Sequence, residues 1–225
     1  MKNEEFNSFG ALVEARRSMR EFTTEPVSET VLREVFTEAG YAPSNCNSQP
    51  WKAVVVTGEK AERMKQTLLN TIGEGKFQLD FHFDDKAYPP MYKERQQGVA
   101  KLYYGAACIA RENIEERGEF IKRNLTFYGA PQAVFLFMPD WGQQREAADM
   151  GRFAQNVMLA MRARNIGSCP QTILGFNADA VREYLGIGPE WKLLFGISFG
   201  YFDKDNPLNQ VRTERASIDE WLTII

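Results

Sequence analysis

A short basic segment, Arg16-Arg17-Ser18-Met19-Arg20, holds residues suited to binding an anion. If this segment is extended, Arg16, Ser18 and Arg20 project from one side, because side chains alternate along an extended chain. Two guanidinium groups and a hydroxyl then form a phosphate cradle, since arginine donates paired hydrogen bonds to phosphate oxygens. The segment also suits the solvated basic end of a helix, and alone it does not decide between the two.

A polar loop, Ala42-Pro43-Ser44-Asn45-Cys46-Asn47-Ser48-Gln49-Pro50-Trp51, offers neutral donors and acceptors. Groups of this kind can form hydrogen bonds with a ring system that alternates carbonyl groups with nitrogen atoms. The prolines stiffen the loop, which lowers the entropy cost of ordering it around a ligand. The same composition is also typical of a capped surface turn.

Two later segments have weaker signals. In Cys169-Pro170-Gln171-Thr172-Ile173-Leu174-Gly175-Phe176 the glycine allows close approach of the backbone to a flat ligand, although a loop glycine is more often part of a turn. Arg212 and Arg215 lie in the tail, where isolated charges are usually solvated.

Composition excludes several classes of function. A net charge of -3 gives no sign of nucleic-acid binding, and a single histidine, His82, argues against a Ser-His-Asp triad or a multi-histidine metal site. The 3 cysteines are widely spaced, so we expect no metal site and no disulfide framework. The first residues do not match a secretion signal, and no run approaches the ~20 apolar residues of a membrane span. We expect a cytoplasmic protein.

Hydrophobic periodicity predicts an α+β fold with a small sheet and many helices. Strands are expected at Ala53–Thr57, Ala133–Met138 and Leu193–Phe199, and helices near 8–17, 28–40, 61–72, 92–127 (broken near 111–113), 145–164 and 177–185. The length suits a single domain, 1–225. Residues 73–110 are expected to form an excursion, and residues 207–225 an arm that wraps onto a partner.

The order of these motifs resembles the FMN-dependent nitroreductase family over essentially the whole chain. The resemblance rests on Arg16–Arg20, on the loop Pro43-Ser44-x-x-Asn47-Ser48-Gln49-Pro50-Trp51, on Gln155-Asn156, on Ile173–Phe176 and on a late arginine. Residues 88–105 and 128–131 look closest to the nitrobenzoate-reductase-like branch. The resemblance implies the nitroreductase-like fold, with a small central mixed β-sheet surrounded by helices, and an intertwined homodimer.

The family pattern also implies roles for individual residues. Arg16, Ser18 and Arg215 would hold the FMN phosphate, with Arg17 beside them, and Arg20 would lie near the pyrimidine edge of the flavin. Pro43, Ser44 and Asn47 would reach the ring and ribityl chain from the other subunit. Leu174 and Gly175 would present backbone amides towards N5, and Asn70 would contact the pyrimidine edge. Two positions depart from the pattern: Arg20 is often lysine, and some members have glutamate at Leu174.

By resemblance, the chain passes electrons from NADPH or NADH to a nitroaromatic acceptor by a ping-pong mechanism. The flavin carries the chemistry, so no catalytic side chain is expected. Tyr88, Tyr92, Phe120, Phe127 and Tyr128 are candidates for the acceptor pocket, although each is more often a core or interface residue. Alternatives are a quinone, enone or flavin reductase or a reductive dehalogenase on the same scaffold. A further alternative is a non-catalytic FMN-binding protein.

Overall fold

The computed structural model describes residues 6–75 and 77–225, so expectations that include residues 1–5 or 76 lie partly outside it. The helices are α1 (Phe9–Ala15), α2 (Glu29–Ala39), α3 (Gly58–Gly73), α4 (Pro90–Ala106), α5 (Ile114–Lys122), α6 (Gln144–Ala163), α7 (Ala178–Leu185) and α8 (Pro207–Gln210). The strands are β1 (Lys52–Thr57), β2 (Gln132–Pro139), β3 (Gly167–Gln171) and β4 (Trp191–Gly200). The expected α+β organisation is confirmed.

The strands form one sheet in the order β1-β2-β4-β3, and each named pair runs antiparallel. The expectation of a mixed sheet is therefore wrong for these strands. Parallel pairing occurs in isolated bridges, such as the one between Ser18 and Ser168. Strand β3 was not predicted, because its sequence Gly-Ser-Cys-Pro-Gln has neither an apolar run nor an alternating pattern.

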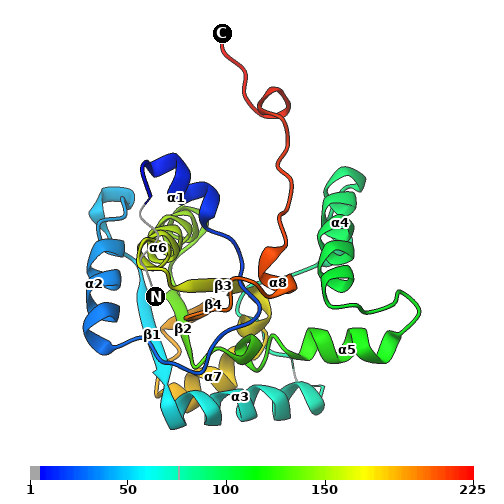
Figure 1. Ribbon diagram of the computed structural model, residues 1–225. Coiled ribbons are helices and arrows are strands. Elements are labelled where there is room, and N and C mark those ends of the chain that lie inside the picture. Colours follow the sequence, from blue (N-terminus) through cyan, green and yellow to red (C-terminus); the bar gives the residue numbers. More distant parts are fainter. Residues whose placement is uncertain (1–5, 76) are drawn as a thin grey trace.

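Alternating side chains of the sheet serve two hydrophobic clusters, because successive residues of a strand point to opposite faces. On β2, Ala133, Phe135 and Phe137 join one cluster, while Val134 and Leu136 join the other. The first cluster includes residues of α3 and α7, and the second includes residues of α2 and α6. Helices thus cover both faces of the central sheet (Figure 1).

Serine side chains cap the starts of α1 and α2. The Ser8 hydroxyl accepts a hydrogen bond from the Ala11 N–H at 3.2 Å, and the Ser28 hydroxyl accepts one from the Val31 N–H at 3.4 Å. These caps satisfy amide groups that have no partner within the helix. Among the described helices, none has the length and apolar composition needed to cross a bilayer.

Helix α4 and the tail after α8 extend away from the helices that pack on the sheet (Figure 1). Between α3 and α4 the chain returns to the Gly175–Phe176 segment, where the Gln78 N–H donates to the Phe176 carbonyl at 2.9 Å. Helix α4 then projects beside the tail. After α8 the tail runs away from the sheet, and its last helical element is a 3-10 turn at Ile218–Glu220.

Candidate functional site

The Arg16–Arg20 segment is extended and lies against β3. Arg16 already has extended backbone angles at the end of α1, and the Met19 N–H donates to the Ser168 carbonyl at 3.0 Å. Met19 is buried, so its side chain enters the core. Alternation then turns Arg16, Ser18 and Arg20 to a shared side, where all three interact with Cys169.

The charge around Cys169 is strongly positive. Burial raises the pKa of its thiol, while Arg20, a hydrogen bond with Ser18, and Arg16 act in the opposite direction. The Cys169 thiol is therefore neutral at pH 7 and does not cancel the two guanidinium charges.

Arg20 is fixed between aromatic rings. Its guanidinium carbon lies 3.6 Å from the centre of the Tyr103 ring and 5.4 Å from that of Tyr128. Tyr128 reaches this position from a left-handed backbone conformation, with φ of 53°. Atom Nη1 of Arg20 is buried and has no hydrogen-bond partner in the described structure. A buried, unpaired guanidinium nitrogen is costly unless a ligand accepts from it.

Arg16 and Arg215 complete a positive group, although 199 positions separate them in the sequence. Burial lowers the pKa of Arg16, and the charge of Arg215 lowers it further. In the described residues neither side chain forms an ion pair with a carboxylate. Glu21, which follows Arg20 in the sequence, pairs with Arg123 at 2.6 Å. Arg16, Ser18 and Arg20 thus meet at Cys169, and the charge of Arg215 acts on Arg16. These four residues form a candidate site for an anion.

Arg17 lies on the other side of the extended segment. Its Nε donates to the Asn209 carbonyl at 2.7 Å, which directs the side chain towards α8. The structure therefore separates Arg17 from the three side chains that meet at Cys169, as alternation requires.

The Pro43–Gln49 loop is held at two points. The buried Asp149 carboxylate accepts from the Asn45 N–H at 2.9 Å, and the Ser44 hydroxyl accepts from the Gln49 N–H at 3.0 Å. Between these points Cys46 and Asn47 have positive φ angles of 51° and 56°. Pro43 and Ser44 line an open cavity of about 640 Å³ together with the first turns of α6.

Leu174 and Gly175 belong to a short 3-10 turn, Thr172–Gly175, which follows β3 and packs against β4. The Leu174 side chain is fully buried, so only its backbone is available to a ligand. At Gly175 an added Cβ would lie 2.9 Å from the Leu194 carbonyl oxygen, which no side chain permits without a shift. Gly175 also lines a cavity of about 310 Å³ with His82, Phe83 and Phe176.

Other predicted residues lie apart from these groups. The exposed Asn70 side chain on α3 accepts from Gln66 at 2.7 Å, one turn earlier in the helix. In the described residues, no hydrogen bond or ion pair connects Asn70 or the Pro43–Gln49 loop to the positive group. Phe120, Phe127 and Tyr128 are buried core residues, whereas Tyr88 and Tyr92 are exposed.

Sequence reasoning missed Tyr103, Asp149 and Asn209, which hold the predicted residues in place. An acid within the apolar stripe of a long helix is a usable signal for Asp149, because buried carboxylates need partners. Asn206-Pro207 marks the start of α8, since asparagine caps helices and proline suits the first turn. Nothing in the sequence marks Asn209, three residues later.

Known proteins share this fold and its length. A model described as the nitroreductase family matches residues 13–201. The chain belongs to the nitroreductase family. It is 41% identical to the nitroreductase NfnB of Mycolicibacterium smegmatis over 93% of this chain and 89% of that protein. It is 30% identical to a 4-nitrobenzoate reductase of Nocardioides sp., covering 97% of this chain and 90% of the relative.

A solved structure extends the similarity to three dimensions. The FMN-dependent nitroreductase NfnB from Mycobacterium smegmatis, in complex with NADPH, is 39% identical and superposes with a TM-score of 0.92. The alignment covers 96% of this chain and 97% of the other. The expected nitroreductase-like fold is confirmed, and the named relatives agree with the nitrobenzoate-reductase-like branch.

Proposed function

We propose that this nitroreductase-family chain is an FMN-dependent oxidoreductase that takes electrons from NADPH or NADH and passes them to nitroaromatic compounds. The proposal is supported by NfnB, whose structure is described as FMN-dependent and in complex with NADPH, and by the 4-nitrobenzoate reductase relative. A ping-pong order follows if donor and acceptor use the same face of the flavin in turn.

The observation that carries the proposal is the positive group of Arg16, Arg20 and Arg215. Arg20 has a buried Nη1 without a partner in the described structure, and Arg16 and Arg215 repel one another. An anionic ligand relieves both costs, because phosphate and the flavin pyrimidine edge accept hydrogen bonds from guanidinium groups. The residues present therefore fit FMN.

In this site Arg16, Ser18 and Arg215 would hold the FMN phosphate, while Arg17 secures the segment against α8. Arg20 would supply positive charge at the pyrimidine edge, where Asn70 would donate or accept a further hydrogen bond. Leu174 and Gly175 would offer backbone amides, since Gly175 has no side chain to block approach. Bound FMN supplies the hydride and electron transfer, so the protein needs no catalytic nucleophile or base of its own.

We further propose a homodimer in which Pro43, Ser44 and Asn47 contribute to the site of the partner subunit. The loop's exposed Pro43 and Asn47 support this assignment, as does the tail of residues 207–225, which extends away from the sheet (Figure 1). Residues 73–110 would border the acceptor site, because His82 and Phe83 of this stretch line a cavity together with Gly175. A cytoplasmic location completes the proposal.

A spectrum of the purified protein tests this function. The protein should be yellow, lose its absorbance near 450 nm (a general property of oxidised flavin) when NADPH or NADH is added without oxygen, and recover it with 4-nitrobenzoate. A colourless protein that does not take up FMN contradicts the proposal. Bleaching without recovery on nitro compounds would redirect the search to quinones, enones or halogenated aromatics. Bound flavin that neither nicotinamide reduces would indicate a non-catalytic FMN protein.

A further inference from the structure

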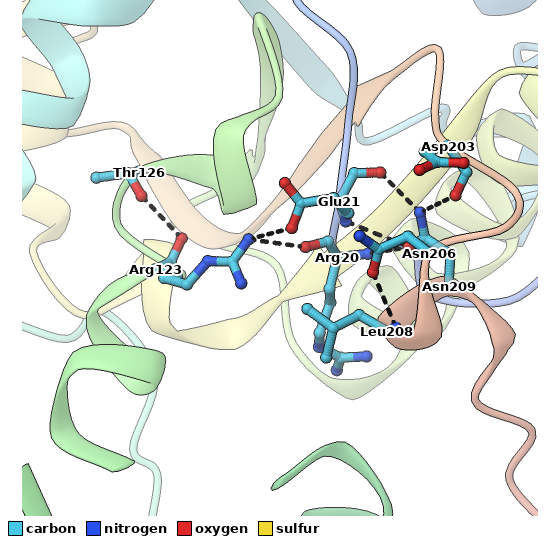
Figure 2. Close-up of polar contacts among 8 residues, drawn as sticks. All are labelled: Arg20, Glu21, Arg123, Thr126, Asp203, Asn206, Leu208 and Asn209. Carbon is cyan, nitrogen blue, oxygen red and sulfur yellow. Dashed lines mark hydrogen bonds and ion pairs between the residues drawn. The ribbon is translucent and has the colours of Figure 1, made fainter. Parts of the chain in front are cut away.

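One buried asparagine connects the two segments that carry the positive group. Asn209 lies in α8 and its residue surface is 0% exposed. Figure 2 shows its side chain between the Arg20–Glu21 backbone and Asp203. The match to the family model ends at residue 201, and Asn209 lies beyond it.

The side chain of Asn209 fixes the backbone at Arg20 and Glu21. Its Oδ1 accepts from the Arg20 N–H at 2.8 Å and from the Glu21 N–H at 3.2 Å. Its Nδ2 donates to the Glu21 carbonyl at 2.8 Å. These three bonds set which residues of the extended segment face β3, because a shift by one residue would turn Arg16, Ser18 and Arg20 away.

The same amide holds the start of the tail. Nδ2 of Asn209 also donates to the Asp203 carbonyl at 2.7 Å, and its backbone carbonyl accepts from Arg17 Nε at 2.7 Å. Six residues after Asn209 the chain reaches Arg215, and on the way Arg212 donates to the Glu14 carbonyl at 3.1 Å. The Asn209 side chain therefore fixes both the segment that carries Arg16 and Ser18 and the start of the tail that carries Arg215.

The side chain is well matched to this task. An amide has one accepting oxygen and two donor hydrogens, and here the oxygen accepts twice while the nitrogen donates twice. A buried amide satisfied in this way has a single low-energy orientation, because any rotation leaves polar groups unpaired. Arg123 supports the outer side of the segment, donating to the Arg20 carbonyl at 3.2 Å.

We propose that Asn209 is a positioning residue for the FMN phosphate, which sets the spacing between Arg16 and Ser18 on one segment and Arg215 on the other. The inference rests on the proposed function. It assigns to Asn209 a larger effect on the phosphate than on the flavin ring, because the phosphate depends on residues of both segments, whereas at the ring only Arg20 depends on Asn209. Riboflavin, which has the same ring and ribityl chain without the phosphate, is the probe that separates the two.

The test measures dissociation constants of FMN and riboflavin by flavin fluorescence for the full-length wild type, Asn209→Ala and the milder Asn209→Ser. The ratio of riboflavin to FMN dissociation constants should fall by about tenfold in Asn209→Ala, which corresponds to losing one well-aligned charge-assisted hydrogen bond. Riboflavin binding should weaken by a smaller factor, because the Arg20 side chain is also held against Tyr103 and its carbonyl by Arg123. If Asn209→Ala does not fold, Asn209→Ser carries the same comparison.

Gln132→Ala is the matched control. The Gln132 side chain is also a buried amide that clamps a backbone, accepting from the Val27 N–H at 2.7 Å and donating to the Val27 carbonyl at 3.1 Å. It should lower stability without changing the ratio. A wild type that prefers FMN, with Asn209 variants that keep the full preference, overturns the inference. A wild type that binds neither flavin overturns the proposed function instead.

Discussion

The Arg16–Glu21 segment and the Pro43–Gln49 loop are held in place in different ways. The first is extended, bonded to β3 and Asn209, and has Arg20 stacked on Tyr103. The second is exposed over most of its length and contains left-handed conformations at Cys46, Asn47 and Gln49. Such conformations cost about 1–3 kcal/mol each and persist only where surrounding contacts enforce them.

The Arg16–Glu21 segment is held by contacts within its own chain. The Pro43–Gln49 loop instead has an exposed surface whose conformation suits a contact outside its own chain. The first segment gathers its charges through buried contacts. The loop has two anchors, at Asp149 and at Ser44, and turns the polar groups between them outward. This contrast supports the proposed roles, in which the first segment binds the phosphate and the loop contacts the flavin ring of the partner subunit.

The largest effect is expected from the first segment. Arg16→Met should weaken FMN binding by about a hundredfold, because paired charge-assisted bonds to phosphate are lost. Riboflavin binding should stay nearly unchanged, since riboflavin has no phosphate. Fluorescence titration measures both, with Arg33→Met as the control, because Arg33 pairs only with Glu29 on the exposed side of α2. Equal weakening of both flavins would remove the distinction between the two segments.

A change that loosens the Pro43–Gln49 loop should weaken the binding of FMN and of riboflavin alike. Asp149→Ala leaves the Asn45 N–H without its acceptor, so we expect the unfolding free energy to drop by about 1–3 kcal/mol. FMN and riboflavin should both bind several-fold more weakly. Asp149→Asn is the control, because its amide oxygen can still accept from Asn45. Urea denaturation and flavin titration are the measurements, and a loss confined to FMN would contradict the contrast.

A smaller effect is expected at Gly175, which belongs to neither segment. Gly175→Ala places a Cβ 2.9 Å from the Leu194 oxygen, and such overpacking costs about 1–3 kcal/mol of stability. Gly118→Ala on α5 is the control. An added Cβ there meets nothing within 4 Å, so helix propensity should raise stability by about 0.5–1 kcal/mol. Thermal unfolding distinguishes the two, and equal effects would show that the backbone at Gly175 is not tightly packed.

The smallest effect concerns Glu38, remote from both segments. Arg164 holds the pKa of the Glu38 carboxyl below its ordinary 4.5. The pair therefore stabilises the fold above that value, and the stabilisation is lost as pH falls through the lower folded pKa. Because the carboxyl is about half exposed, Glu38→Gln should cost no more than about 0.5 kcal/mol at pH 7. Urea denaturation should show a smaller difference at pH 3 than at pH 7, and flavin affinity should not change. A larger difference at pH 3 than at pH 7 would reverse the assigned direction.

Much of the fold follows from hydrophobic pattern. The run Ala133–Met138 became β2 and the stripe near 145–164 became α6, because these segments bury long apolar surfaces. Strand β3 could not be predicted, since its pairing with β4 and with Ser18 depends on distant partners. The antiparallel order likewise depends on tertiary contacts and not on local sequence.

The conformation of the Arg16–Arg20 segment was predictable because local alternation sufficed. Alternation correctly placed Arg16, Ser18 and Arg20 on one side of an extended segment. The approach of Arg215 could not be derived from spacing, because it depends on Asn209 and the path of the tail. Whether the loop, Asn70 and Gly175 contact flavin stays a prediction, since these residues form no contact with the positive group in the described part of the chain.

The most direct test of the two-segment account measures the FMN content of mixed dimers. One subunit would carry Arg16→Met, and the other would carry Ser44→Ala with Asn47→Ala, a pair of changes confined to the loop. If each site takes its arginines from one subunit and its loop from the other, one site of the mixed dimer has both defects and the other has none. The account predicts that mixed dimers regain half of the wild-type FMN at a concentration where neither altered homodimer binds it. No recovery in the mixed dimer would contradict it.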